Sequence, residues 1–113
     1  MIKKLFRNFL NSVNGIRIVF KESSFVLEIL LGIIIIPYIL IENVTILIKL
    51  LVISTYMLLL SFEIFNTAIE KLCDKITKKK DHDIKKIKDL ASASVFVILI
   101  ILFIQIIIIF QKT

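Results

Sequence analysis

Apolar residues follow two different patterns along the chain, and both predict helices. In residues 2–20 they recur at spacings of three and four, and polar or basic residues fill the other side. This periodicity is typical of an amphipathic helix that lies in the headgroup layer of a membrane or packs against its own protein. Three later segments, residues 25–41, 46–70 and 90–110, are mostly apolar on all sides. We expect each of these to cross a membrane.

The three apolar segments differ in where they carry charge. Residues 25–41 contain one charged side chain, Glu28, and Pro37 is expected to kink this helix because it removes a backbone donor. After a short break at residues 42–45, the second helix is expected to run from Ile46 to beyond Asp74. Residues 90–110 carry no charge, and a helix of that length spans roughly 31 Å, about one hydrocarbon core.

These patterns predict an all-α membrane protein with a single domain over residues 1–113. It would consist of an amphipathic surface helix (1–21), three spans (25–41, 46–70 and 90–110), and a charged segment (71–88) that joins the last two spans. Composition agrees, because 58% of the residues are hydrophobic, more than soluble domains usually carry. The single cysteine, Cys73, excludes a disulfide within the chain.

Basic residues are concentrated in two blocks, which sets the expected orientation. Of the 15 lysines and arginines, five lie in residues 1–27 and eight in residues 71–88. Because basic loops stay on the cytoplasmic side, we expect the N-terminus and residues 71–88 to be cytoplasmic and the C-terminus to lie outside. No nucleic-acid partner is expected, since the basic blocks flank apolar spans without a recognition motif.

The second span carries a polar stripe that points to chemistry. Glu63, Asn66, Glu70 and Asp74 fall within about 80° of one another around a helix. A charged side chain at the centre of a membrane costs about 2.5–3.5 kcal/mol on insertion scales, and stacked carboxylates repel one another. A divalent metal with phosphates would compensate them, and so would a lysine or arginine from a neighbouring helix. The stripe could also serve as packing contacts between helices or as a solvated helix end, a reading that fits Glu70 and Asp74 better than Glu63.

Two further groups of residues flank this stripe. Glu22 and Glu28 lie near the start of the first span, but six residues apart they would face different sides of a straight helix. Either a bend or a second subunit would be needed to bring both to one site. Lys88 and Asp89 precede the small residues 91–94, which would allow close helix packing or leave room for a ligand.

The strings E-x-x-N-T-A-I-E at residues 63–70, Lys88-Asp89, and E-x-x-F-x-x-E at residues 22–28 resemble the prokaryotic diacylglycerol kinase family. The resemblance covers nearly the whole chain. It implies a homotrimer in the bacterial inner membrane, with active sites shared between subunits at the cytoplasmic face. The implied activity is transfer of phosphate from ATP to a membrane lipid, with Mg²⁺ as the cofactor.

The resemblance also implies roles for individual residues. Glu63 would be the general base, Glu22 and Glu70 would hold Mg²⁺, and Asn66 would orient the groups around it. The residues expected to contact ATP are Lys4, Asn11, Glu22, Glu70, Asp74, Lys79, Lys80, Asp81, Lys88 and Asp89. Those expected to contact the lipid are Lys4, Ser12, Glu28, Lys49, Glu63, Asn66 and Ser92.

The sequence leaves alternatives both for the lipid substrate and for the class of function. The upstream string, residues 22–28, favours diacylglycerol, while undecaprenol is the substrate of related enzymes in the same family. Val26 and Leu27 stand where the family often has Arg-Gln. The nonenzymatic alternatives are a holin-like pore protein, which would not need the polar stripe, and an assembly subunit that uses the acids for packing.

Overall fold

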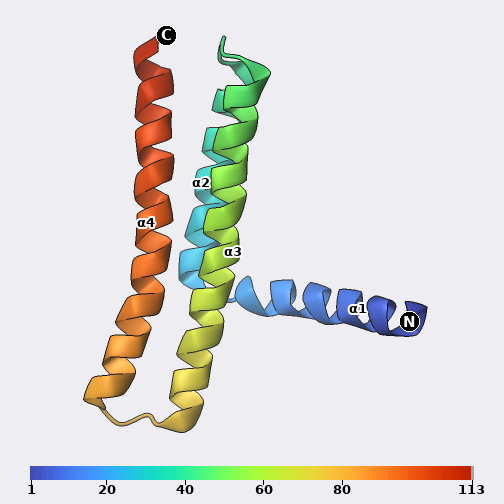
Figure 1. Cartoon of the computed structure of the whole chain (residues 1–113), viewed down its shortest axis with the longest axis vertical. Coiled ribbons are helices and arrows are strands. Elements are labelled where there is room, and N and C mark those ends of the chain that lie inside the picture. Colours follow the sequence, from blue (N-terminus) through green and yellow to red (C-terminus); the bar gives the residue numbers. More distant parts are fainter. Residues whose placement is uncertain (113) are drawn as a thin grey trace.

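The computed structural model describes residues 1–112, and these residues form four α-helices without any strand. The helices are α1 (Ile2–Val19), α2 (Ser23–Ile41), α3 (Ile46–Ile76) and α4 (His82–Lys112). α3 packs against both α2 and α4, and α1 leaves the bundle sideways (Figure 1). α2, α3 and α4 are each long and apolar enough to cross a membrane. The predicted all-α architecture is therefore confirmed.

α3 and α4 are longer than a membrane is thick. Each has 31 residues, which corresponds to about 46 Å, against about 30 Å of hydrocarbon. α4 begins at His82, ahead of the uncharged span, because Asp81 caps it. The Asp81 Oδ1 accepts the backbone N–H groups of Asp83 at 2.9 Å and Ile84 at 3.0 Å. The lysine-rich ends of both helices thus extend beyond their apolar parts.

The apolar core lies in the half of the bundle that contains the 42–45 turn. Its buried members come from all three long helices: Ile35, Ile39, Val52, Tyr56, Leu59, Leu102 and Ile109. The Tyr56 hydroxyl donates to the backbone carbonyl of Glu28 at 2.8 Å. A Cβ atom at Gly32 would overlap the Tyr56 ring, so this glycine permits the close approach of α2 and α3.

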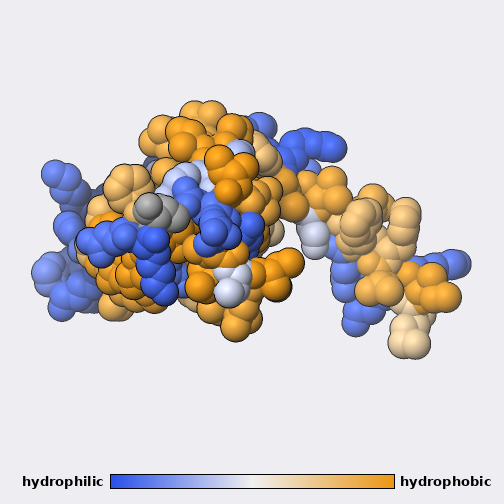
Figure 2. All heavy atoms as spheres, turned by 90° about the horizontal axis from the view of Figure 1, so that it is seen from above, coloured by the Kyte–Doolittle hydropathy of each residue, from blue (hydrophilic) through white to orange (hydrophobic). Residues whose placement is uncertain are grey.

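The corner between α1 and α2 is fixed by apolar contacts. Val19 and Phe25 are almost completely buried, and the rings of Phe20 and Phe25 meet edge to face at 5.1 Å. Beyond this corner, residues 2–14 of α1 are exposed. Figure 2 shows α1 with both apolar and polar side chains, while apolar side chains cover much of the visible bundle. This exterior suits a lipid environment.

Candidate functional site

The buried polar side chains of residues 1–112 share one face of α3. They are Glu63, Asn66 and Thr67, and only 5% of Glu63 is exposed. The Asn66 side-chain amide donates to Glu70 Oε1 at 2.9 Å. Asp74, one turn further, is exposed. The structure therefore brings the predicted stripe together, from a buried carboxyl group to the solvated end of the same helix.

Other acidic side chains gather around Glu63. The carboxyl groups of Glu28 on α2, Glu70 and Glu22 all lie close enough to act electrostatically on it. The helical backbone is interrupted between α1 and α2, so Glu22 lies just before α2 and not within it. With this bend, Glu22 and Glu28 both lie within electrostatic range of Glu63. Carboxylates this close repel one another unless a proton or a cation lies among them.

Two buried oxygen atoms of this cluster have no hydrogen-bond partner. They are Oε1 of Glu28 and Oδ1 of Asn66. Both atoms can accept a hydrogen bond, so a ligand with a hydroxyl donor or a positive charge would match them. A lipid hydroxyl group meets the first condition.

A mostly apolar groove of about 340 Å³ runs between α3 and α4, and Asn66 is the residue of this cluster that lines it. Its lining residues are Phe62, Phe65, Asn66, Ile69, Ile87, Leu90, Ala91 and Ser94. Ser92, predicted from the sequence as a lipid contact, is exposed and does not line this groove. Ser94 does, with its hydroxyl donating to the Ala91 carbonyl at 2.6 Å. The sequence shows both serines, but only the packing of α4 on α3 decides which one faces the groove.

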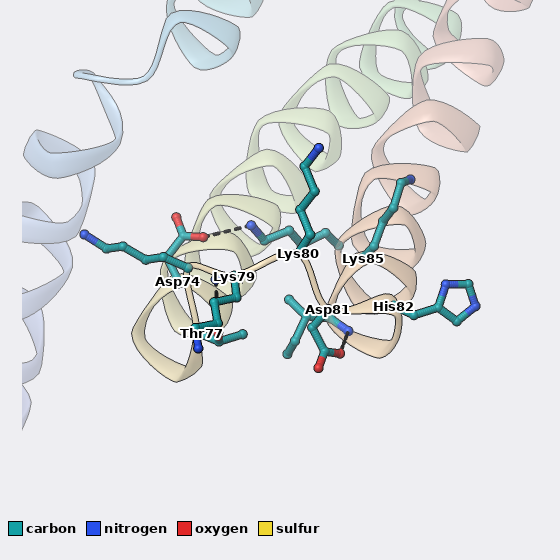
Figure 3. Close-up of a pocket in the computed structure, with 10 residues that line it drawn as sticks. Asp74, Thr77, Lys79, Lys80, Asp81, His82 and Lys85 are labelled. Carbon is teal, nitrogen blue, oxygen red and sulfur yellow. Dashed lines mark hydrogen bonds and ion pairs between the residues drawn. The ribbon is translucent and has the colours of Figure 1, made fainter.

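A basic pocket of about 570 Å³ lies where α3, the loop and α4 meet (Figure 3). It is lined by Asp74, Thr77, Lys78, Lys79, Lys80, Asp81, His82, Ile84, Lys85 and Lys88. Of the predicted ATP contacts, Asp74, Lys79, Lys80, Asp81 and Lys88 are thus brought together. The excess of lysine ammonium groups suits a polyphosphate ligand.

Lys88 and Asp74 join the two helices at this pocket. The Lys88 Nζ atom lies 2.8 Å from Asp74 Oδ1, and the contact appears as a dashed line in Figure 3. The pair lies on the charged helix ends outside the apolar spans. The hydrogen bond from Lys88 lowers the pKa of the Asp74 carboxyl group, and in turn it raises the pKa of Lys88.

Other predicted contacts lie elsewhere. Asp89 pairs with Lys85 along α4 at 2.7 Å and does not line the basic pocket. Lys49 donates to the Leu40 carbonyl at 2.8 Å, beside the 42–45 turn at the other end of the bundle. The remaining three, on the exposed α1 helix, are Lys4, Asn11 and Ser12.

The carboxylates have suitable chemistry for Mg²⁺. Among residues 1–112, no three acidic, histidine or cysteine side chains are arranged as a ready-made metal site. Mg²⁺ is usually bound by one or two carboxylates together with phosphate and water oxygens, so a preformed cage is not required. Glu22 and Glu70, which both act on Glu63, would provide two such ligands.

The fold and these clusters define a small α-helical membrane protein with carboxyl groups and a basic pocket toward one end of its bundle. The sequence model of the family described as prokaryotic diacylglycerol kinase matches residues 10–110. The chain belongs to this family, which is one of lipid kinases. A search among curated proteins gave no match.

Proposed function

We propose that the protein transfers the γ-phosphate of ATP to the hydroxyl group of diacylglycerol, forming phosphatidic acid at the cytoplasmic membrane face. The observation that carries this proposal is the burial of Glu63 among other carboxyl groups on a membrane-spanning helix. A buried acid in such a helix is costly without a function or a partner. The basic pocket lies further along the same helix and provides the lysines that ATP phosphates need.

The chain's own residues would divide the reaction among them. The Glu63 carboxylate accepts the proton of the lipid hydroxyl as its oxygen attacks the γ-phosphorus, and ADP leaves. Asn66 positions Glu70 through their hydrogen bond. Lys88 exchanges Asp74 for a phosphate oxygen. Mg²⁺, held by Glu22 and Glu70, would neutralise phosphate charge.

We also propose a membrane arrangement and an assembly. Residues 25–41, 46–70 and 90–110 would span the membrane, with the N-terminus and residues 71–88 in the cytoplasm. The assembly would be a homotrimer with shared active sites. Support comes from α1, which extends away from its own bundle (Figure 1). This helix carries the exposed residues Lys4, Asn11 and Ser12. There they could serve a neighbouring subunit.

A polyprenyl alcohol is the second candidate substrate. The groove beside Asn66 is lined by Phe62, Phe65 and other apolar side chains. Such a lining suits the prenyl chain of a polyprenyl alcohol as well as the acyl chain of a diacylglycerol. Undecaprenol carries a terminal hydroxyl that could reach Glu63 in the same way.

Phosphate transfer from MgATP to each lipid tests the proposal. The purified protein in mixed micelles should convert diacylglycerol to phosphatidic acid. Glu63→Gln should reduce this rate at least about a hundredfold, because the base is lost. Glu42→Gln, which changes an acid at the opposite end of the bundle, should leave it intact. Transfer to undecaprenol alone would reassign the substrate. A correctly folded protein that phosphorylates neither lipid would refute the kinase function.

A further inference from the structure

Lys71 makes an ion pair that the family motif does not explain. Its ammonium nitrogen lies 3.4 Å from Oε1 of Glu22. Glu22 is the N-cap residue of α2, yet its side chain forms no capping hydrogen bond. Its carboxylate instead points across to α3, where Lys71 directly follows Glu70. A lysine of the chain itself therefore pairs with one of the two proposed Mg²⁺ ligands, Glu22.

We propose that Lys71 is a built-in counter-cation that competes with the divalent metal for Glu22. This inference rests on the proposed function, because that function makes Glu22 a metal ligand. A lysine ammonium group offsets the repulsion among Glu22, Glu63 and Glu70 when no metal is bound. A divalent cation that binds to Glu22 competes with the ammonium group for the negative charge of that carboxylate. Lys71 thus sets the concentration of metal at which the site fills.

The competition should be modest because the ion pair is partly exposed. The side chains of Lys71 and Glu22 are 56% and 37% exposed. Pairs in such positions are screened by water and are weak. Removing the lysine charge should therefore tighten metal binding by about two- to fivefold, without creating a new site.

Direct binding of Mn²⁺, measured by electron paramagnetic resonance, tests this inference without any need for catalysis. The full-length protein in lipid nanodiscs, without nucleotide, would be titrated as wild type, Lys71→Gln and Lys75→Gln. Lys75 lies one turn further along α3 and makes no ion pair within residues 1–112. Lys71→Gln should bind Mn²⁺ about two- to fivefold more tightly than both other proteins. Lys75→Gln controls for the general loss of positive charge.

A second substitution ties the effect to Glu22. In the double variant Glu22→Gln/Lys71→Gln, the gain in Mn²⁺ affinity should disappear. Equal Mn²⁺ affinities of Lys71→Gln and Lys75→Gln would overturn the inference. A gain in Mn²⁺ affinity that persists in the double variant would overturn it too, and so would the absence of Mn²⁺ binding by every variant. Failure of this inference can be told apart from failure of the proposed kinase function. An enzyme that receives its metal only together with ATP would bind no Mn²⁺ here but would still phosphorylate its lipid.

Discussion

Position along the bundle decides what each charged residue of the site can do. Glu63 is buried beside Glu28, where an unneutralised charge is costly and a reacting hydroxyl would meet little competing water. Lys88 lies at the solvated end, paired with Asp74. Because water screens such a pair, Lys88 can exchange Asp74 for a phosphate at little cost. Burial thus suits Glu63 to proton transfer, and exposure suits Lys88 to capturing a ligand.

Lys88→Gln should weaken the use of ATP while leaving the fold intact. We expect the KM for ATP to rise about tenfold, because a charged hydrogen bond to phosphate is lost. The thermal midpoint should change little, since an exposed ion pair contributes little stability. Steady-state kinetics and thermal unfolding measure the two effects. Lys86→Gln, which removes a nearby charge that does not line the basic pocket, is the control. An equal rise in KM for both variants would contradict the assignment of Lys88.

At the scale of helices, periodicity predicted the elements but could not predict how they are rotated against one another. The apolar runs marked α2, α3 and α4, and the spacing of Glu63, Asn66 and Glu70 correctly placed them on one face. Which face of α4 meets α3 depends on packing, and this packing places Ser94 rather than Ser92 in the groove. The ion pair of Lys71 depends in the same way on the corner before α2.

Gly32 gives a direct test of how closely α2 and α3 must approach. Gly32→Ala should reduce the free energy of unfolding by about 1–3 kcal/mol, because the added methyl group overlaps the buried Tyr56 ring. Gly15→Ala is the matched control, since a Cβ atom there meets nothing within 4 Å and alanine favours a helix. Unfolding of both variants in mixed micelles measures the difference. If Gly32→Ala unfolds like the wild type, the close packing of these helices is wrong.

In the molecule as a whole, the apolar core and the candidate site lie in different halves of the bundle. The buried apolar core occupies the half of the bundle near the 42–45 turn, while Glu63 and the basic pocket lie toward the 77–81 loop. The arm formed by α1 leaves its own bundle (Figure 1). A site completed by the arm of another subunit would explain how such a small chain could surround both ATP and a lipid.

Mixed assemblies can show whether the arm acts on a neighbouring subunit. An arm variant, Lys4→Gln/Asn11→Ala/Ser12→Ala, and Glu63→Gln should each have low activity alone. Co-expressed in equal amounts, they should recover up to about a quarter of wild-type activity, because some sites then combine an intact arm with an intact Glu63. Glu63→Gln mixed with Glu70→Gln should recover none, since both residues lie on one helix of one chain. If the arm variant also fails to complement Glu63→Gln, the arm serves its own chain, and the sites are not shared through α1.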